Sequence, residues 1–492
     1  MRMNFIDFLF EHTKDSDEIL ILSRNSSCTY RETWSDVIRT SRWIQNSIGM
    51  DKRIGILADN STFFIKAYAG IIHSGNTAVI IDTKSSPKDI EHILTLCSIS
   101  IVFADKKYEP MLEKARVISS ELPVISDGGQ SYPSRIPKDE CAVIIFTSGT
   151  TGIKKGVMLT HNNLIANTSS ILQYLNLSSD DRMMVVLPFF YCYGASLLHT
   201  HIRVGASLVL DNSPFLGGAL NGINDLQCTG FAGVPSTFLI MVHKTPFLSM
   251  DFPSLRYFTQ AGGHLACSVI HEIARTFPEK KFFVMYGATE ATARLSYLPP
   301  ELLFEKPDSI GKGIPGVTLE VRGEDGKIVN PGEVGEIAAS GENIMAGYLG
   351  EPEETARVIK DGWYYTGDLA TVDNEGFIYI VGRKGTFIKS AGFRVSPQEI
   401  EDVIMQVDNV GTCVVFGTSH PILGEAIIAC IQSDYNEKRL ISSVKKHCTG
   451  RLPSHKQPTD IFVLRNLPLN SSGKPDRDAI KRLYLSHDRR TD

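Results

Sequence analysis

The sequence lacks the features that mark membrane proteins and disulfide-rich secreted proteins. No stretch approaches the ~18 uninterrupted apolar residues that a membrane-spanning helix requires. The first residues place Asp7 and Glu11 inside what would have to be the apolar centre of a signal peptide. The nine cysteines are scattered and form no C-x-x-C pair, which argues against a zinc site or a disulfide framework and favours reduced thiols. We therefore expect a cytoplasmic protein with no membrane span.

A strong charge of either sign is also absent. Lys and Arg number 50 against 55 Asp and Glu, which gives a formal net charge of -5. Such a balance provides no general attraction to nucleic acid or to an anionic membrane, so we expect no nucleic-acid partner. No internal repeat or low-complexity tract is present. The 42% of hydrophobic residues fit a globular protein, and 492 residues are enough for about three packing units.

A loop rich in Gly, Ser and Thr follows the short apolar run at residues 142–146. Residues 147–157 read T-S-G-T-T-G-I-K-K-G-V. Its two first glycines let successive backbone N–H groups face an anion, and Lys154 or Lys155 supplies a positive charge, so the loop suits a polyphosphate. The order is not that of a Walker A loop, because Lys154 stands where that motif needs glycine and Gly156 stands where it needs Ser or Thr. A P-loop ATPase or GTPase is therefore disfavoured.

This loop resembles the phosphate loop of the adenylate-forming superfamily, which comprises acyl- and aryl-CoA synthetases, stand-alone adenylation enzymes, peptide-synthetase adenylation domains and firefly luciferase. Four more motifs follow in the family's order: Y-G-A-T-E at 286–290, Y-T-G-D at 365–368, Gly382-Arg383 running to Glu401, and L-N-S-S-G-K at 469–474. The resemblance spans essentially the whole chain and implies an AMP-forming acid–thiol ligase. A carboxylic acid and Mg-ATP would give an acyl-adenylate and pyrophosphate, and the thiol of CoA or of phosphopantetheine on a separate acyl carrier protein would then displace AMP.

The hydrophobic pattern predicts an α/β fold. Short apolar runs alternate with amphipathic stretches up to about residue 300, which is typical of βα units and predicts two layered sheets. Turn signals crowd the chain after Gly311, as in a small antiparallel β-barrel, and a β/α pattern returns after Lys384. Pro397, followed by acidic residues, predicts a helix start. We expect a large adenylating domain at 1–383, a hinge at 384–385 and a small mobile α+β lid domain at 386–492, which is also the architecture that the resemblance implies.

The resemblance implies a role for each residue of the nucleotide site. Thr289 would hydrogen-bond the α-phosphate, Glu290 would bind Mg²⁺ and Tyr286 would pack on the adenine. Asp368 would accept both ribose hydroxyls. Taken alone, each of these residues has a simpler interpretation, such as a core aromatic residue or a turn aspartate. Only the ordered set of motifs favours a role in nucleotide binding. The full ATP-binding set is Thr147, Ser148, Gly149, Thr150, Thr151, Gly152, Lys155, Gly262, Gly263, Tyr286, Gly287, Asp368 and Arg383.

The lid carries a further set of expected residues. Lys474 resembles the lysine that bridges the carboxylate and the α-phosphate during adenylation, and together with Thr289 and Glu290 it completes the catalytic set. Lys389 and Gly392 resemble the loop that lines the pantetheine tunnel in the second half-reaction. Gly385 is the expected pivot, because glycine has the least restricted φ and ψ. By analogy with the family, proline there is expected to preserve adenylation and to block transfer to the thiol.

The acid pocket departs from the family's common pattern. Tyr191 stands where many acyl-CoA synthetases have histidine and where peptide-synthetase domains have the aspartate that anchors an α-amine. Because a phenol cannot pair with an ammonium as a carboxylate does, we expect α-amino acids to be poor substrates. The pocket is predicted from Tyr191, Gly233, Val234 and Gly262. The sequence leaves open which acid is used and whether CoA or a carrier protein accepts it. It also leaves three rivals: a stand-alone amino-acid adenylation enzyme that loads a carrier protein, a non-catalytic nucleotide-binding relative and a luciferase-type oxygenase.

Overall fold

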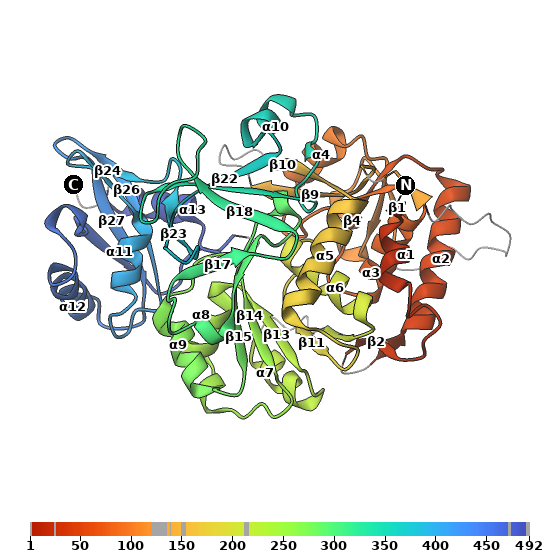
Figure 1. Ribbon diagram of the computed structural model, residues 1–492, viewed down its shortest axis with the longest axis horizontal. Coiled ribbons are helices and arrows are strands. Elements are labelled where there is room, and N and C mark those ends of the chain that lie inside the picture. Colours follow the sequence, from red (N-terminus) through yellow and green to blue (C-terminus); the bar gives the residue numbers. More distant parts are fainter. Residues whose placement is uncertain are drawn as a thin grey trace.

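The computed structural model describes residues 2–23, 26–119, 135–137, 139–148, 154–210, 216–470 and 474–488. It is a mixed α/β structure with a large N-terminal and a small C-terminal domain, as the sequence predicts. In Figure 1 the large domain extends from the red helices on the right to the green strands in the centre, and the small domain lies on the left in blue. The predicted hinge at 384–385 lies between β23 (Ile378–Arg383) and β24 (Ile388–Ser390), and its role stays a prediction.

The first sheet has seven strands in the order β20-β10-β9-β5-β4-β6-β7. The five strands from β9 to β7 run parallel, while β10 and β20 form an antiparallel edge. Local signals start its helices, since the Ser61 hydroxyl accepts the Phe64 N–H and Pro87 lies in the first turn of the next helix. The elements are β4 (Arg53–Leu57), α3 (Thr62–His73), β5 (Thr77–Ile80), α4 (Pro87–Leu96), β6 (Ile101–Ala104), β7 (Arg116–Ile118), β9 (Cys141–Ser148), β10 (Lys154–Thr160) and β20 (Gly347–Tyr348).

The second sheet has fourteen strands, of which β2, β12, β11, β13, β14 and β15 are parallel. The antiparallel strands expected after Gly311 are present, and β16 and β17 join them to the parallel part, so the predicted barrel region continues this sheet. Its strands are β2 (Ile19–Leu22), β3 (Ser27–Thr29), β11 (Arg182–Val185), β12 (Ser207–Leu210), β13 (Gly230–Gly233), β14 (Tyr257–Gln260), β15 (Lys281–Tyr286), β16 (Ser296–Leu298), β17 (Ser309–Gly313), β18 (Val317–Arg322), β19 (Gly335–Gly341), β21 (Ile359–Lys360), β22 (Trp363–Val372) and β23.

One continuous core holds the two sheets together. The same buried cluster contains Ile54 and Ile80 from the first sheet and Met183 and Leu208 from the second. Burial of apolar side chains is the main stabilising contribution, so this shared core fixes the relative position of the two sheets. The helices of the large domain are α1 (Phe5–Phe10), α2 (Tyr30–Ser47), α5 (His161–Leu175), α6 (Cys192–Val204), α7 (Leu216–Asp225), α8 (Pro235–Lys244), α9 (Cys267–Thr276) and α10 (Pro352–Val358), with α3 and α4 above.

The small domain has its own core and its own five-stranded sheet. Val415, Ile431 and Val444 are fully or almost fully buried within it, so it can move as a unit. The helix predicted at Pro397 is confirmed as α11. The elements are β24, β25 (Phe393–Val395), α11 (Pro397–Ile404), β26 (Thr412–His420), β27 (Gly424–Gln432), α12 (Glu437–Thr449), β28 (Asp460–Leu464) and α13 (Arg477–Asp488). A separate two-stranded pair, β1 (Arg2–Met3) and β8 (Arg135–Ile136), lies at the N-terminus.

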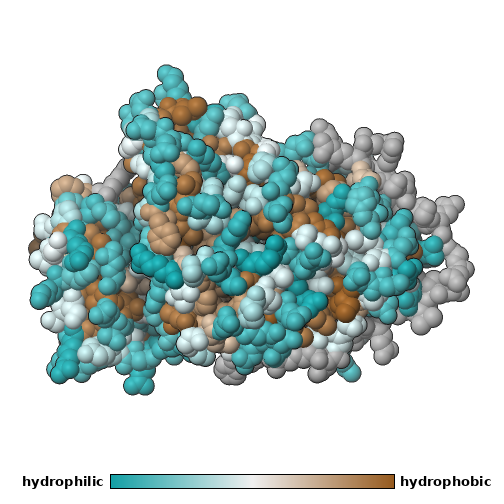
Figure 2. Space-filling model, turned by 60° about the horizontal axis from the view of Figure 1, so that its bottom comes forward, coloured by the Kyte–Doolittle hydropathy of each residue, from teal (hydrophilic) through white to brown (hydrophobic). Residues whose placement is uncertain are grey.

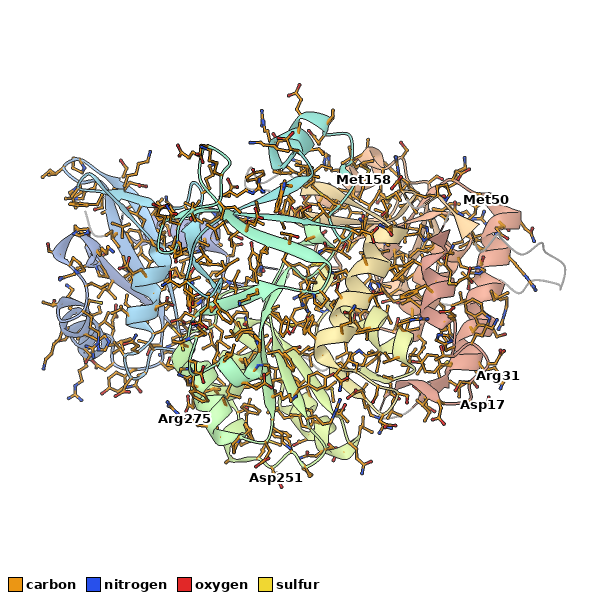
Figure 3. The ribbon with its side chains drawn as sticks, in the orientation of Figure 1. Asp17, Arg31, Met50, Met158, Asp251 and Arg275 are labelled. Atoms are coloured by element: carbon orange, nitrogen blue, oxygen red, sulfur yellow. The ribbon has the colours of Figure 1, made fainter. Side chains whose placement is uncertain are left out.

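The surface is that of a charged globular protein. On the face drawn in Figure 2, hydrophilic residues predominate and hydrophobic ones are scattered among them. Figure 3 shows charged side chains pointing outward, such as Arg31 and Asp17, whose 2.7 Å ion pair ties the start of α2 to the segment before β2. Among the residues described, no helix is long and apolar enough to cross a membrane. All nine cysteines are free thiols, in agreement with the expectation of reduced cysteines.

Candidate active site

A cavity of about 680 Å³ lies where the carboxyl ends of β14 and β15 meet the antiparallel strands and the small domain. Its volume falls within the usual range for small-molecule sites, and the edge where parallel strands end is the usual place for a ligand in an open α/β sheet. Most of the residues predicted from the sequence line it. Those that do are Thr147, Lys155, Tyr191, Gly262, Gly263, Tyr286, Gly287, Thr289, Glu290, Asp368, Arg383 and Lys474.

Asp368 and Tyr286 form one side of the cavity. The Tyr286 hydroxyl donates to Asp368 Oδ2 at 2.6 Å, and Arg383 Nε lies 3.6 Å from Asp368 Oδ1. Burial raises the pKa of Asp368, although Arg383 acts in the opposite direction. Burial and the adjacent Asp368 also raise the pKa of Tyr286 well above its ordinary value, so its hydroxyl stays protonated and donates. Strand pairing places Asp368 opposite Arg383, which explains how residues fifteen positions apart share one site.

The Y-G-A-T-E loop leaves β15 and turns back sharply. A Cβ atom on Gly287 would lie 1.9 Å from the Ala293 carbonyl oxygen, so only glycine fits there. Thr289 donates its hydroxyl hydrogen to the sulfur of Cys192 at 3.4 Å. Glu290 Oε1 accepts a hydrogen bond from the Tyr348 hydroxyl at 2.9 Å, and it forms no ion pair with any described residue. The loop therefore presents a hydroxyl and an uncompensated carboxylate to the cavity.

That carboxylate fits a magnesium ion held jointly with a nucleotide. Within the described ranges, no three His, Cys, Asp or Glu side chains are grouped so that they could hold a metal by themselves. Mg²⁺ is usually bound by one or two carboxylates together with substrate phosphates and water. A single carboxylate such as Glu290, in a cavity that Thr147 and Lys155 also line, matches that arrangement.

The structure distinguishes between the two lysines of the phosphate loop. Lys155 lines the cavity, with its Nζ 2.5 Å from a carboxylate oxygen of Glu354 and 5.3 Å from the centroid of the Tyr348 ring. Lys154 donates to Ser85 Oγ at 2.6 Å. Of these two lysines, Lys155 is therefore the one that faces the cavity. Of the other loop residues, Ser148 ends β9, and Gly149, Thr150, Thr151 and Gly152 lie outside the described residues.

Lys474 enters the cavity from the small domain. Its backbone N–H donates to Asn470 Oδ1 at 3.0 Å, and its carbonyl accepts from the Asn470 N–H at 2.7 Å. A Cβ atom on Gly262, whose φ is +90°, would lie 3.6 Å from Lys474 Cε. Burial lowers the pKa of Lys474. The observed domain orientation thus presents Lys474 to the nucleotide side of the cavity.

Four further predicted residues, two from each domain, do not line this cavity. Val234 packs against Gly262, since a Cβ atom added to Gly262 would lie 3.2 Å from Val234 Cγ1. A Cβ atom added to Gly233 would contact the side chains of Phe238 and Thr237. Neither Gly233 nor Val234 forms part of the cavity wall. Lys389 and Gly392 are exposed around the turn between β24 and β25 of the small domain. Their proposed part in the second half-reaction stays a prediction.

The cavity also has wall residues that the motifs did not reveal. Tyr348, Glu354 and Arg294 line it, and so does Glu336, which accepts the Gly367 N–H at 3.0 Å. Tyr348 belongs to a two-residue strand and Glu354 to a short exposed helix, so no periodic pattern marks either of them. A lone arginine four residues after Glu290 gave no signal of its own.

A histidine–aspartate pair connects the two domains beside the cavity. His264, which follows Gly263, has its Nε2 2.6 Å from Oδ1 of Asp402 in α11. Burial disfavours the charged form of His264, but the hydrogen bond and charge of Asp402, together with Asp308 and Glu401, raise its pKa above the ordinary 6.5. The protonated pair therefore stabilises the orientation that presents Lys474. A second link, Lys244 to Asp434 at 2.5 Å, is exposed and contributes little.

This pair predicts a pH dependence of the domain orientation. Because the pKa of His264 is raised in the paired state, its contribution is fully present below about pH 6.5 and is lost as pH rises through the raised pKa. We expect the adenylation rate of the native protein, divided by that of His264→Asn, to fall a few-fold between about pH 6 and 9. Dividing the pH profile of the native protein by that of His264→Asn cancels the effects of the other titrating groups, which both proteins share. A ratio that does not change with pH would contradict the link.

Fold and cavity together define an adenylating enzyme, and comparisons with known proteins identify the family. The family model for the AMP-binding enzyme matches residues 10–349, and the model for the AMP-binding enzyme C-terminal domain matches residues 399–474. The chain therefore belongs to the AMP-binding enzyme family. The prediction of an adenylate-forming superfamily member with the function of an AMP-forming acid–thiol ligase is confirmed.

Similar proteins include several CoA ligases. Feruloyl-CoA synthase of Amycolatopsis sp is 28% identical over 93% of this chain and 94% of its own length. 2-Succinylbenzoate–CoA ligase of Geobacillus sp. is 28% identical over 96% of each chain. Among solved structures, o-succinylbenzoate CoA synthetase from Bacillus subtilis, in complex with its acyl-adenylate intermediate, has a TM-score of 0.87 and 25% identity over 98% of each chain.

Proposed function

We propose that the protein joins a carboxylic acid to the thiol of CoA in two steps, with ATP and Mg²⁺. In the first step a carboxylate oxygen attacks the α-phosphorus of ATP, forming the acyl-adenylate and releasing pyrophosphate. In the second step the thiol sulfur attacks the acyl carbon, AMP leaves and the thiol proton passes to solvent. The observation that carries the proposal is that Lys474 from the small domain and Asp368, Glu290 and Thr289 from the large domain face one cavity.

Each cavity residue has a part in the first step. Asp368 and Arg383 would hold the ribose, and Tyr286 would pack on the adenine. Lys155 and Lys474 would neutralise charge on the phosphates, and a pre-positioned cation of this kind acts most strongly where water is excluded. Mg²⁺ beside Glu290 would supply further charge neutralisation. Solved relatives support this assignment, since the o-succinylbenzoate enzyme of Bacillus subtilis is also known in complex with ATP and a magnesium ion.

CoA is the acceptor that the relatives favour. Curated proteins that match nearly the whole chain carry the names of CoA ligases, including a long-chain fatty-acid ligase from Salmonella typhimurium that is 27% identical over 95% of this chain. A carrier-protein phosphopantetheine remains the second candidate, because it presents the same thiol. An assay that supplies CoA and, separately, phosphopantetheinylated carrier proteins distinguishes the two.

The experiment for the proposal is ATP–pyrophosphate exchange over a panel of short, long, aryl and amino acids, followed by thioester formation with the best acid. Exchange dependent on both an acid and Mg²⁺ supports adenylation, and formation of an acyl-CoA completes the assignment. A folded protein that binds ATP and exchanges pyrophosphate with none of the acids would instead be a non-catalytic relative. Light emission or oxygen uptake with an adenylated acid would indicate the luciferase-type reaction.

The same panel tests the expectation about amino acids. We expect an α-amino acid to be activated at least about tenfold more slowly than the matched acid without the amine, because the Tyr191 side of the cavity offers a phenol where an ammonium needs a carboxylate. The matched pairs are alanine with propanoate and phenylalanine with 3-phenylpropanoate. An α-amino acid that outperforms its partner would identify the protein as a stand-alone amino-acid adenylation enzyme.

A further inference from the structure

Arg294 is a buried cation in the wall of the cavity. Only 3% of its surface is exposed, and none of the described residues places a carboxylate within ion-pair distance of it. Its Nε donates to the sulfur of Met285 at 3.3 Å, and its Nη1 donates to the Ala293 carbonyl at 3.4 Å. Its guanidinium lies 4.0 Å from the centroid of the Tyr193 ring. The charge is therefore met by a ring face, a thioether, one long hydrogen bond and the neighbouring Tyr174 hydroxyl, none of which is an anion.

This environment leaves the guanidinium short of acceptors. An arginine carries five N–H donors and is charged at every accessible pH. A thioether sulfur is a weak acceptor, and a buried cation without a paired anion is strongly disfavoured. A planar guanidinium with free donors matches a carboxylate, which can accept two parallel N–H bonds. The site is thus suited to an anion that arrives with the ligand.

The backbone of Arg294 is fixed in place by two buried amides. Asn167 Nδ2 donates to its carbonyl at 3.1 Å, and Asn343 Nδ2 donates at 2.9 Å. Both asparagines are almost completely buried. The segment is therefore anchored, while the charged end of the side chain has no carboxylate partner among the described residues.

A chain of contacts leads from Thr289 to Arg294 along the cavity, because Thr289 contacts Cys192 and the ring of the next residue, Tyr193, lies against the Arg294 guanidinium. The thiol of Cys192 accepts from the Thr289 hydroxyl, and Cys192, Tyr191 and Tyr193 line the same part of the cavity. Burial raises the pKa of Cys192, whereas the charges of Arg294 and Lys474 both lower it. An acid whose first carboxylate lies at Thr289 and Lys474 would extend past Cys192 toward Arg294.

We propose, given the acid-activating function proposed above, that the natural substrate is a carboxylic acid with a second carboxylate, and that the second carboxylate pairs with Arg294 while the first is adenylated. Arg294 is then the residue that determines specificity. The tyrosine rings beside it would contact the carbon chain between the two carboxylates.

The test uses acids that differ only in the second carboxylate: butanoate with butanedioate, pentanoate with pentanedioate, hexanoate with hexanedioate, and benzoate with benzene-1,3-dicarboxylate. For the native protein we expect kcat/KM for pyrophosphate exchange to favour at least one diacid over its monoacid by about tenfold or more, mainly through KM, since a hydrogen bond to a charged group contributes about 1.5–3 kcal/mol. Arg294→Met should abolish that preference, so that the ratio of diacid to monoacid kcat/KM falls to about one or below, while Arg294→Lys should retain part of it.

The matched control is Arg275→Met, because Arg275 is an exposed arginine on α9, at the lower edge of Figure 3. It should leave both rates unchanged. If every monoacid exceeds its diacid in the native protein, or if Arg294→Met slows both members of a pair equally, Arg294 only supports the fold and the proposal is wrong, although the proposed function stands. If Arg294→Met does not fold, the diacid preference of the native protein and its partial loss in Arg294→Lys decide whether the proposal holds. Absence of exchange with every acid overturns the proposed function itself.

Discussion

Lys474→Ala is expected to lower the rate of acyl-adenylate formation by about two to three decades, the scale for removing one pre-positioned charge from a transition state. In the observed orientation Lys474 lines the cavity, and its neighbour across the domain boundary is the backbone of Gly262. Pyrophosphate exchange measures this step. Thioester formation from a pre-made acyl-adenylate should change much less, because that half-reaction is expected to use the other face of the small domain.

Lys446→Ala provides the control for this experiment. Lys446 is an exposed lysine on α12 of the same domain, so its removal changes the net charge equally without altering the cavity. We expect both half-reactions to keep their native rates in that variant. Equal loss of both half-reactions in Lys474→Ala would contradict the role assigned to Lys474 in adenylation. If the small domain carries Lys474 out of the cavity after the first step, the loss of this lysine cannot slow the second step.

Gly385→Pro is expected to lower pyrophosphate exchange by at least about tenfold, since holding a residue against its allowed backbone region costs about 1–3 kcal/mol. Gly385 has φ of +86° in the orientation that presents Lys474. Proline fixes φ near about -65°, so it cannot adopt this conformation. We therefore replace the sequence-based expectation that proline would preserve adenylation, because Gly385 has positive φ in the orientation that presents Lys474.

Alanine substitutions distinguish a hinge at Gly385 from simple backbone strain at a glycine with positive φ. Gly385→Ala and Gly326→Ala form a matched pair, because both glycines have positive φ, +86° and +78°, and no atom lies within 4 Å of an added Cβ. If Gly385 is the hinge, the alanine there should change the ratio of the two half-reactions, whereas Gly326→Ala should only lower the melting temperature slightly. A folded Gly385→Pro variant with native exchange would show that the chain does not pivot at this residue.

The ordered motifs were sufficient to locate most of the cavity wall. Tyr286, Glu290, Asp368 and Lys474 were predicted from their neighbours in the sequence, and the structure brings all four to one cavity. Such motifs can be recognised in a sequence because each requires particular residues at positions where the backbone geometry is restricted. Gly287 illustrates this, since its close approach to the Ala293 carbonyl excludes every residue with a side chain.

The acid side of the cavity was predicted less well. Gly233 and Val234 were expected in the wall, but the Gly262 backbone covers Val234. Arg294 was not predicted at all, although it lies four residues after Glu290. Nothing in a linear sequence shows whether an arginine is solvated or buried without a partner, because that depends on which side chains from other elements surround it.

The sequence by itself determined the α/β class, the two sheets, the family and most of the motif residues that line the cavity, because these depend on hydrophobic period and on local backbone requirements. Only the tertiary structure decided which strands join which sheet. Residues 19–22 cross to the second sheet to pair with β12, and Asp368 meets Arg383 through strand register. It also brought Lys155 and not Lys154 to the cavity, placed His264 against Asp402, and buried Arg294 with no carboxylate of the described residues beside it. These outcomes depend on contacts between segments far apart in the chain, which no local pattern encodes.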